Sequence, residues 1–335
     1  MKTDVCITID VEFTIGGAFA DPYNKLPVAD RAVECAVNGK SQGLGFILET
    51  LQAHDLSATF FVETLNHHFF GDAAMRGFAQ QIVAAGHDVQ LHLHPCWRHF
   101  QHSDWRERLN ATPPNDSMAG RNPADLEALI SDGIETLQRW GIPRPLALRT
   151  GGLQVDLTVY AAQARLDIPL ASNVGLAVWQ PQEPQLQLHG GRHWISEVLE
   201  VPTLSYCDLR LPGRRHLKTA TITGSAWEEL RALLWLTHHQ QRGPVTILCH
   251  PSEFVKHQDL QYTRLQPNRL NQRRFQQLCR FLATHRDTFN PTTFIAAKDQ
   301  WLVADSSEDP QVFTPLWVTL KRLVENTLND AFVSY

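Results

Sequence analysis

The sequence predicts an α/β protein built on a parallel β-sheet that is covered by helices. Apolar runs of strand length alternate with amphipathic stretches of helix length through most of the 335 residues. Such alternation predicts consecutive strand–helix units. Polar residues gather directly after the apolar runs, where the carboxyl ends of parallel strands meet. A closed barrel would bring these residues onto one rim, whereas an open sheet would spread them along one edge.

The predicted strands are the short apolar runs. They cover residues 5–9, 58–62, 89–94, 146–149, 168–171, 197–202 and 245–249. Runs of this length between helical stretches are typical of buried parallel strands.

Predicted helices lie between these strands. The amphipathic stretches cover residues 43–54, 73–85, 122–140, 156–163, 225–241 and 273–285. Gly86 is a stop signal for the second stretch. The third has Asn122 as its N-cap, Pro123 as its first helical residue and Gly141 at its end. The polar segments 101–121 and 209–223 are predicted to be loops.

We expect one large domain over residues 1–304 and a separate C-terminal segment over residues 305–335. The segment starts polar and then becomes amphipathic, with apolar residues at Leu316, Leu320, Leu323, Val324 and Leu328. An amphipathic helix has one side to bury. The segment is therefore expected to pack on the main domain or to form a contact in a homo-oligomer.

The composition excludes several functional classes. A hydrophobic content of 43% and a charged content of 19% are typical of a folded globular protein. A net charge of −5 leaves no basic surface for nucleic acid. No apolar run reaches the roughly 18 residues of a membrane span, and no glycine-rich nucleotide-binding motif is present. The chain enters its first strand without an apolar leader, and its six cysteines lack CxxC spacing, so we expect a cytoplasmic protein with buried free thiols.

A short histidine-rich run holds the strongest functional signal. His92 and His94 are separated by one residue at the end of a predicted strand, so both imidazoles project from the same face. Two imidazoles at one point suit a borderline metal such as zinc, and a carboxylate is a preferred third ligand. Asp10 and Glu12 likewise end the first predicted strand on one face. The sequence therefore predicts a divalent-metal site.

Adjacent histidines occur at two other places, His67–His68 and His238–His239. Both pairs lie in or near predicted helices. Neighbouring residues of a helix do not face one site. We interpret these four histidines as solvated or packing residues.

Five segments between residues 5 and 255 follow one another in an order that is typical of a known family. They are Ile7-Thr8-Ile9-Asp10-Val11-Glu12, Ala58-Thr59-Phe60-Phe61-Val62, Gly86-His87-Asp88-Val89 with His92 and His94-Pro95, Leu148-Arg149-Thr150-Gly151-Gly152, and Ile247-Leu248-Cys249-His250-Pro251. The chain thereby resembles the polysaccharide deacetylase family, the NodB-homology carbohydrate esterases. The resemblance implies a distorted, partly incomplete (β/α) barrel of six to eight parallel strands.

The resemblance also implies an activity. The family's enzymes are metal-dependent hydrolases, and the expected substrate is an N-acylated, N-acetylated by preference, amino sugar or glycan precursor. Glu12, His92 and His94 would hold the metal, with zinc expected from the ligand types. The remaining roles would fall to Asp10 as general base, His250 as general acid and Arg149 as the group that keeps Asp10 ionised.

Other residues near these motifs are weaker candidates for the site. Gly151 and Gly152 would let the backbone pass close to the substrate. Trp97 could stack on a sugar ring, although tryptophan is an equally good core residue. The family's histidines usually stand four apart, and Cys96 lies four residues after His92. A thiolate also suits zinc, so Cys96 remains a rival to His94.

Two further functions stay open from the sequence. A C–N hydrolase of a small cyclic amide or ureide is a known branch of the same fold, and it would have a closed polar pocket rather than an open groove with aromatic residues. A pseudoenzyme would bind a sugar or a partner without turnover. Retention of both acids, both histidines, Arg149 and His250 argues against the pseudoenzyme.

Overall fold

A curved parallel sheet forms the centre of the molecule. The computed structural model describes residues 2–211, 214–309 and 311–331. Seven neighbouring strands run parallel in the order β12-β1-β4-β5-β6-β7-β9. Their bounds are β1 (Thr3–Val11), β4 (Thr59–Glu63), β5 (Asp88–Leu93), β6 (Ala147–Thr150), β7 (Leu170–Ala171), β9 (Val198–Glu200) and β12 (Val245–Cys249). Two short strands complete the sheet: β8 (His193–Ile195) lies antiparallel to β9, and β15 (Phe289–Pro291) pairs with the start of β1.

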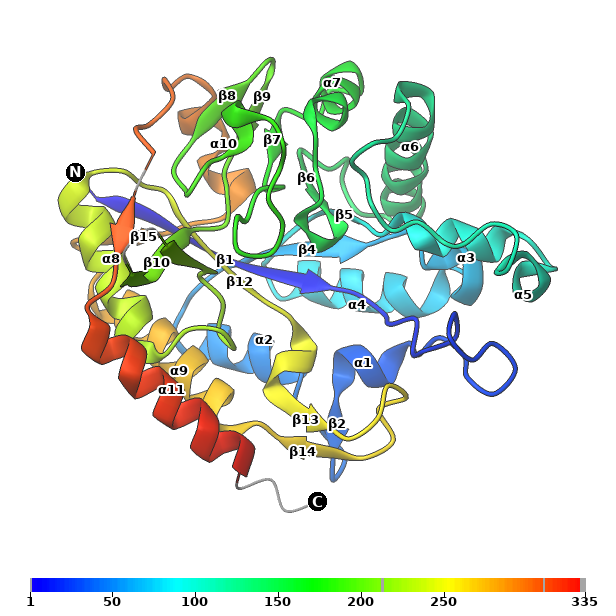
Figure 1. Cartoon of the computed structure of the whole chain (residues 1–335), viewed down its shortest axis with the longest axis horizontal. Helices are drawn as coiled ribbons and strands as arrows, with labels where there is room; N and C mark the ends of the chain where they lie inside the picture. Colours follow the sequence, from blue (N-terminus) through cyan, green and yellow to red (C-terminus); the bar gives the residue numbers. More distant parts are fainter. Residues whose placement is uncertain (1, 212–213, 310, 332–335) are drawn as a thin grey trace.

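The sheet curls until its two ends nearly meet. Single parallel bridges join Thr203 to Thr246 and Thr221 to Leu248, so the chain that follows β9 and β11 lies beside β12. The structure is therefore a distorted (β/α) barrel and not an open sheet, as the family resemblance implied (Figure 1). Curling brings the carboxyl ends of β12, β1, β5 and β6 around one mouth.

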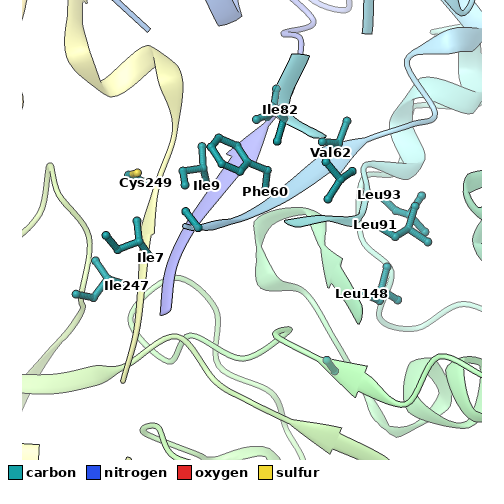
Figure 2. Close-up of a cluster of buried hydrophobic side chains, with 14 of the residues drawn as sticks. Ile7, Ile9, Phe60, Val62, Ile82, Leu91, Leu93, Leu148, Ile247 and Cys249 are labelled. Carbon is teal, nitrogen blue, oxygen red and sulfur yellow. The ribbon is translucent and has the colours of Figure 1, made fainter. Parts of the chain in front are cut away.

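Helices cover the outside of the barrel (Figure 1). They are α2 (Leu44–Ala53), α4 (Ala73–Ala84), α6 (Pro123–Arg139), α7 (Leu157–Arg165), α8 (Trp227–Gln240) and α9 (Arg269–Thr284). Figure 2 shows the apolar layer beneath them, where Ile7 and Ile9 of β1 lie with Phe60 of β4 and Ile82 of α4. These side chains are 2% exposed or less, and burying each stabilises the fold by about 1.5–3 kcal/mol. Because side chains alternate along a strand, the residues between them face the barrel interior.

A second apolar cluster fills the lower part of the interior. Phe61 and Leu170 point inward and contact Phe294 and Trp301 of α10 (Phe294–Leu302). The first turn of α10 is fixed to the starts of β4 and β5, since the Phe294 amide donates to Thr59 Oγ1 at 3.0 Å and the Ile295 amide donates to Asp88 Oδ2 at 3.1 Å. The α10 helix therefore closes the amino-terminal end of the barrel and leaves the carboxyl-terminal ends of the strands uncovered by this helix.

The predicted strands and long helices are present with small shifts at their ends. The Asn122 side chain caps α6 by accepting from the Asp125 amide at 2.9 Å, as predicted. Gly86 and Gly141 follow α4 and α6 with φ of +82° and +79°, which favours glycine. All six cysteines are buried and free.

The loop prediction for residues 209–223 is wrong. Strands β10 (Ser205–Leu211) and β11 (Arg214–Thr219) form an antiparallel hairpin there, and β16 (Val312–Phe313) pairs with β10. Residues 212 and 213 lie outside the described chain. Charged residues concealed the hairpin, because Arg210, Arg214, Arg215 and Lys218 break the apolar pattern of a buried strand.

Short elements connect the larger ones, and the sequence pattern did not reveal most of them. They are α1 (Asp30–Glu34), α3 (His67–Phe70), α5 (Trp105–Arg108), β2 (Ala36–Val37), β3 (Lys40–Ser41), β13 (Val255–His257), β14 (Leu265–Pro267) and the 3₁₀ turns η1 (Pro95–Gln101), η2 (Gly151–Leu153), η3 (Pro184–Leu186) and η4 (Pro251–Phe254).

The C-terminal segment contains the helix α11 (Leu316–Ala331), which contacts α8 and β10. Its buried side chains include Val318, Thr319 and Arg322, and Arg322 donates to Asp208 Oδ2 at 2.6 Å and to Glu229 Oε1 at 3.0 Å. Residues 310 and 332–335 of this segment lie outside the described chain. Among the described helices, none is long and apolar enough to cross a bilayer.

Candidate active site

Four strand ends bring six predicted site residues together at the open end of the barrel. Asp10 lies near the end of β1 and Glu12 directly after it, and His92 and His94 have the same relation to β5. The list is completed by Arg149 of β6 and His250, which follows β12. Period-two alternation turns these side chains to the interior, so the spacing noted in the sequence produces the convergence.

Glu12, His92 and His94 form a compact set of metal-ligating atoms. Glu12 Oε2 lies 3.3 Å from His92 Nε2 and 2.8 Å from His94 Nε2. All three ligand atoms lie within 4.8 Å of one another. Ligands about 2.1 Å from a tetrahedral zinc ion would be ~3.4 Å apart. The two separations from Glu12 lie close to this value, so the residues present fit a divalent cation.

The other nitrogen of each imidazole is held by a protein acceptor. His92 Nδ1 donates to the carbonyl oxygen of Arg149 at 2.9 Å. His94 Nδ1 donates to Asp116 Oδ2 at 2.7 Å. A carbonyl or carboxylate on Nδ1 orients the ring and leaves the lone pair of Nε2 for a ligand role. Both histidines thus carry the outer partners that are typical of metal-bound imidazoles.

The charges around Glu12 keep it ionised. Burial would raise the pKa of its carboxyl, but the charge of His94, the hydrogen bonds from both histidines and the charge of His250 hold that pKa well below its usual value. Burial likewise opposes a charge on His94, and Glu12 and Asp116 outweigh burial and raise its pKa. Glu12 and His94 therefore attract each other strongly.

Asp10 is held from one side by Arg149, which is fully buried. Arg149 Nη1 donates to Asp10 Oδ1 at 2.6 Å and to Thr8 Oγ1 at 3.0 Å. Its Nη2 donates to Ser172 Oγ at 2.8 Å, and the guanidinium lies 4.1 Å from the centroid of the Phe61 ring. Removing one partner of such a buried pair costs about 3–5 kcal/mol, so the contact fixes the orientation of the Asp10 side chain.

The second oxygen of Asp10 faces the histidines. Asp10 Oδ2 lies 4.0 Å from His92 Nε2 and 3.8 Å from His250 Nε2. These separations exceed a hydrogen bond. Oδ2 is consequently an acceptor that points at the centre of the site without a partner at hydrogen-bonding distance among these side chains.

His250 is held by a carboxylate of its own. Its Nδ1 donates to Glu253 Oε1 at 2.8 Å. Burial would lower the pKa of His250, but Glu253, Glu12 and Asp10 together raise it from 6.5 to about 9. At neutral pH the ring is therefore protonated and can donate from Nε2.

The prediction that Trp97 lines a sugar site is wrong. Trp97 is 1% exposed and packs against Phe70 and Phe100 in the core. Trp97 belongs to η1, which begins directly after His94, and its indole is buried in the core and does not enter the site. Aromatic residues fit a core and a sugar site equally well, so the sequence could not separate the two.

The two predicted glycines differ in their surroundings. Gly151 is buried, and a Cβ there would lie 2.5 Å from His94 Nδ1. The backbone therefore passes directly behind the imidazole, as the sequence predicted for this turn. Gly152 is exposed, with φ of +58°.

Cys96 does not lie among the clustered ligand atoms. Its backbone amide donates to Asp116 Oδ1 at 3.2 Å. Burial and the neighbouring Asp116 raise the pKa of its thiol well above the usual value. A protonated thiol is a poor ligand, and His94 occupies the position beside Glu12. The geometry thus favours His94 over Cys96.

Four supporting residues were not identified from the sequence. They are Thr8, Asp116, Ser172 and Glu253. Thr8 shares the inward face of β1 with Asp10, and Glu253 lies three residues after His250, so alternation and spacing could have found both. Asp116 and Ser172 come from distant segments, and no local pattern marks them.

Sequence comparison finds no matching family model and no matching curated protein. The solved structures similar to this chain include polysaccharide deacetylases, the family that its motifs resemble. A Mycobacterium smegmatis protein provisionally named a polysaccharide deacetylase is 14% identical, with 93% of this chain and 95% of that chain covered and a TM-score of 0.49. The Streptomyces lividans family 4 carbohydrate esterase, solved with acetate, is 11% identical, with 92% and 98% covered and a TM-score of 0.42. A Bacillus anthracis family 4 pseudoenzyme is 12% identical, with 94% and 70% covered and a TM-score of 0.42. At these values the likeness concerns the fold alone.

Proposed function

We propose that this protein is a zinc-dependent hydrolase that removes an N-acyl group, acetyl by preference, from an amino sugar in a glycan or glycan precursor. One observation carries the proposal. The Glu12–His92–His94 set lies between a carboxylate held by arginine and an imidazolium held by glutamate. Amide hydrolysis needs this combination of electrophilic assistance, base and acid.

Glu12, His92 and His94 are the residues that would hold the ion. A divalent cation supplies Lewis acidity there, which acidifies water and polarises an acyl carbonyl. The protein contributes an ionised carboxylate and two imidazoles whose Nε2 atoms face that carboxylate, because Asp116 and the Arg149 carbonyl occupy the Nδ1 atoms.

Asp10 is the proposed base. Its Oδ1 is occupied by Arg149 and its Oδ2 faces the cluster. It would accept a proton from the attacking water while a bond forms between the water oxygen and the acyl carbon. Arg149 holds the carboxylate in the orientation that this step needs.

His250 is the proposed acid. When the carbon–nitrogen bond breaks, the leaving nitrogen must gain a proton, and Nε2 of His250 lies 3.8 Å from Asp10 Oδ2 at the same centre. The products are then a carboxylate and a free amine. A pKa near 9 keeps the donor protonated at neutral pH, and a bound cation would lower this value because it offsets the charge of Glu12.

The exposure of the site favours a large substrate over a small one. Glu12, His94 and His250 have side chains that are 32%, 20% and 29% exposed, whereas Asp10 and Arg149 are 5% and 0% exposed. The ligands and the acid thus face solvent, and the base lies on the floor. A carbohydrate chain can approach such an open face, which supports the sugar deacetylase over the small-amide hydrolase.

The decisive experiment measures metal content and acetate release together. The purified protein, reconstituted with zinc, should release acetate from oligomers of N-acetylglucosamine, and chelation should abolish the release. A protein that holds zinc in this cluster and releases no acetate from any N-acetylated glycan would support the pseudoenzyme. Activity that survives complete chelation would overturn the metal-dependent mechanism.

A further inference from the structure

We propose that His67, His68 and Asp132, joined by the side-chain amide of Gln101, form a second divalent-metal site on the outside of the barrel. His67 and His68 belong to α3 and Asp132 belongs to α6, two helices that lie side by side (Figure 1). The site shares no residue with the Glu12–His92–His94 set. Its class is a structural site for zinc or a similar borderline cation.

The two imidazoles converge on one carboxylate. His67 Nε2 lies 3.0 Å from Asp132 Oδ1, and His68 Nε2 lies 2.8 Å from Asp132 Oδ2. The centroids of the two rings are 3.9 Å apart. Each residue offers one ligand atom within 4.8 Å of the others. This donor set, two imidazoles and one carboxylate, is the same as in the barrel mouth.

Convergence of adjacent histidines is unusual on a helix, where successive side chains point about 100° apart. Here α3 has only four residues and ends at Gly71, with φ of +68°. A single turn does not impose the spread of a long helix, so both rings reach α6. The structure thus differs from the expectation that adjacent histidines of a helix do not face one site, because both rings lie against Asp132.

The side-chain amide of Gln101 offers a fourth candidate ligand. His68 Nε2 lies 2.8 Å from Asp132 Oδ2, which can only accept, and 3.0 Å from Gln101 Nε2, which can only donate. One ring nitrogen cannot donate to the first and accept from the second at the same time. Rotating the Gln101 amide by half a turn relieves the conflict, because the amide oxygen then lies beside His68. That oxygen becomes a fourth candidate ligand.

Burial and charge also suit a cation. The side chains of His67, His68 and Asp132 are 18%, 13% and 24% exposed. The nearby guanidinium of Arg139 is already paired with Asp72 through two contacts of 2.8 Å. Among the described residues, Asp132 forms ion pairs with His67 and His68 and none with arginine or lysine.

Four protein ligands would give a closed site, which is typical of structural rather than catalytic zinc. Gln101 is the last residue of η1, and η1 begins directly after His94. A cation bound here would tie α3, α6 and η1 together. It would therefore stiffen the segment that leads away from the candidate active site without entering the chemistry.

The test separates the two sites by variants of the full-length protein. The His92→Ala variant disables the site in the barrel mouth, so any remaining zinc reports on the second site. Titration of this variant with zinc alone should show one bound equivalent and a rise in Tm. Adding His67→Ala and His68→Ala should remove both the equivalent and the rise in Tm.

The chain offers a matched control in His238 and His239, an adjacent pair on α8 that is not among the clustered ligand groups. Replacing both with alanine in the His92→Ala background should leave one zinc equivalent. Asp132→Asn provides a second, conservative variant if the histidine replacements impair folding, and it should weaken zinc binding at least tenfold. A His92→Ala protein that binds no zinc, or equal binding after loss of His67 and His68, would overturn the proposal. Neither result bears on deacetylation, which the wild-type protein tests separately.

Discussion

The two histidine pairs that converge on a carboxylate differ in how they are built. His92 and His94 lie two residues apart, so strand alternation places their rings on one face. The ring centroids are 4.9 Å apart and the interplanar angle is 86°. His67 and His68 are adjacent on one short helical turn, and their ring centroids are 3.9 Å apart with an interplanar angle of 44°. The first pair is surrounded by a buried aspartate held by Arg149 and a histidine held by Glu253, whereas the second pair lies near the more exposed ion pair of Asp72 with Arg139. The comparison teaches that equal donor sets acquire different chemistry from the groups around them.

The largest expected effect is the loss of activity when the histidine pair in the barrel mouth, His92 and His94, is disrupted. His92→Ala should abolish both zinc binding in the barrel mouth and acetate release, because it removes one of three ligands. Metal analysis and an acetate assay on the same sample check this. Full activity with undiminished zinc would show that the pair in the barrel mouth does not hold the catalytic ion.

A second prediction tests whether turnover needs the residues around the metal ligands and not the ion alone. Asp10→Asn should keep the metal and reduce turnover by about 10²–10⁴-fold, the usual effect of losing a general base. Glu12→Gln should lose the metal instead. Thermal unfolding of both variants controls for the buried charge of Arg149, which loses its ionised partner in Asp10→Asn. Equal metal loss in the two variants would mean that Asp10 is itself a ligand.

The third prediction concerns pH. Because the pKa of His250 is raised to about 9, the protonated acid is present at neutral pH and is lost as the pH rises. Turnover should therefore fall on the alkaline side, at a pH no higher than about 9. His250→Ala should retain metal, lose most of the rate and lose this falling limb. A variant with an unchanged profile would indicate that His250 has only a structural role at the end of β12, where it is hydrogen-bonded to Glu253.

The smallest expected effect on turnover comes from the outer pair, His67 and His68, on the outside of the barrel. Replacing His67 and His68 with alanine in the otherwise native chain should leave turnover close to that of the wild type while lowering Tm in the presence of zinc. Turnover and unfolding curves measured with and without a chelator check this. A large loss of turnover with normal zinc content in the barrel mouth would mean that the outer pair takes part in the reaction and would weaken the contrast.

Local patterns explain why much of the site was predictable. Alternation along β1 and β5 places Asp10 with Glu12 and His92 with His94, and alternation is visible in any sequence. The family resemblance added Arg149 and His250. The barrel itself could be chosen over an open sheet only through the same resemblance, because closure depends on single bridges such as Thr203 to Thr246.

The residues that escaped prediction depend on contacts between distant segments. Asp116 reaches His94 from a loop without a recognisable pattern, and Asp132 reaches His67 and His68 across more than sixty positions. Trp97 was assigned to the site because a tryptophan beside a ligand looks the same in a sequence whether it faces sugar or core. Burial decides between the two, and burial is a property of the folded molecule.

Gly151 shows how a residue without a side chain can be as constrained as a ligand. Any Cβ at this position would meet the ring of His94, with Nδ1 at 2.5 Å and Cε1 at 2.6 Å. The ring cannot retreat without leaving Glu12 and Asp116, the two carboxylates that hold it. In a saturation-mutagenesis map, Gly151 would consequently be as intolerant as the metal ligands, and a chain with alanine there would need a different route to the same ligand geometry.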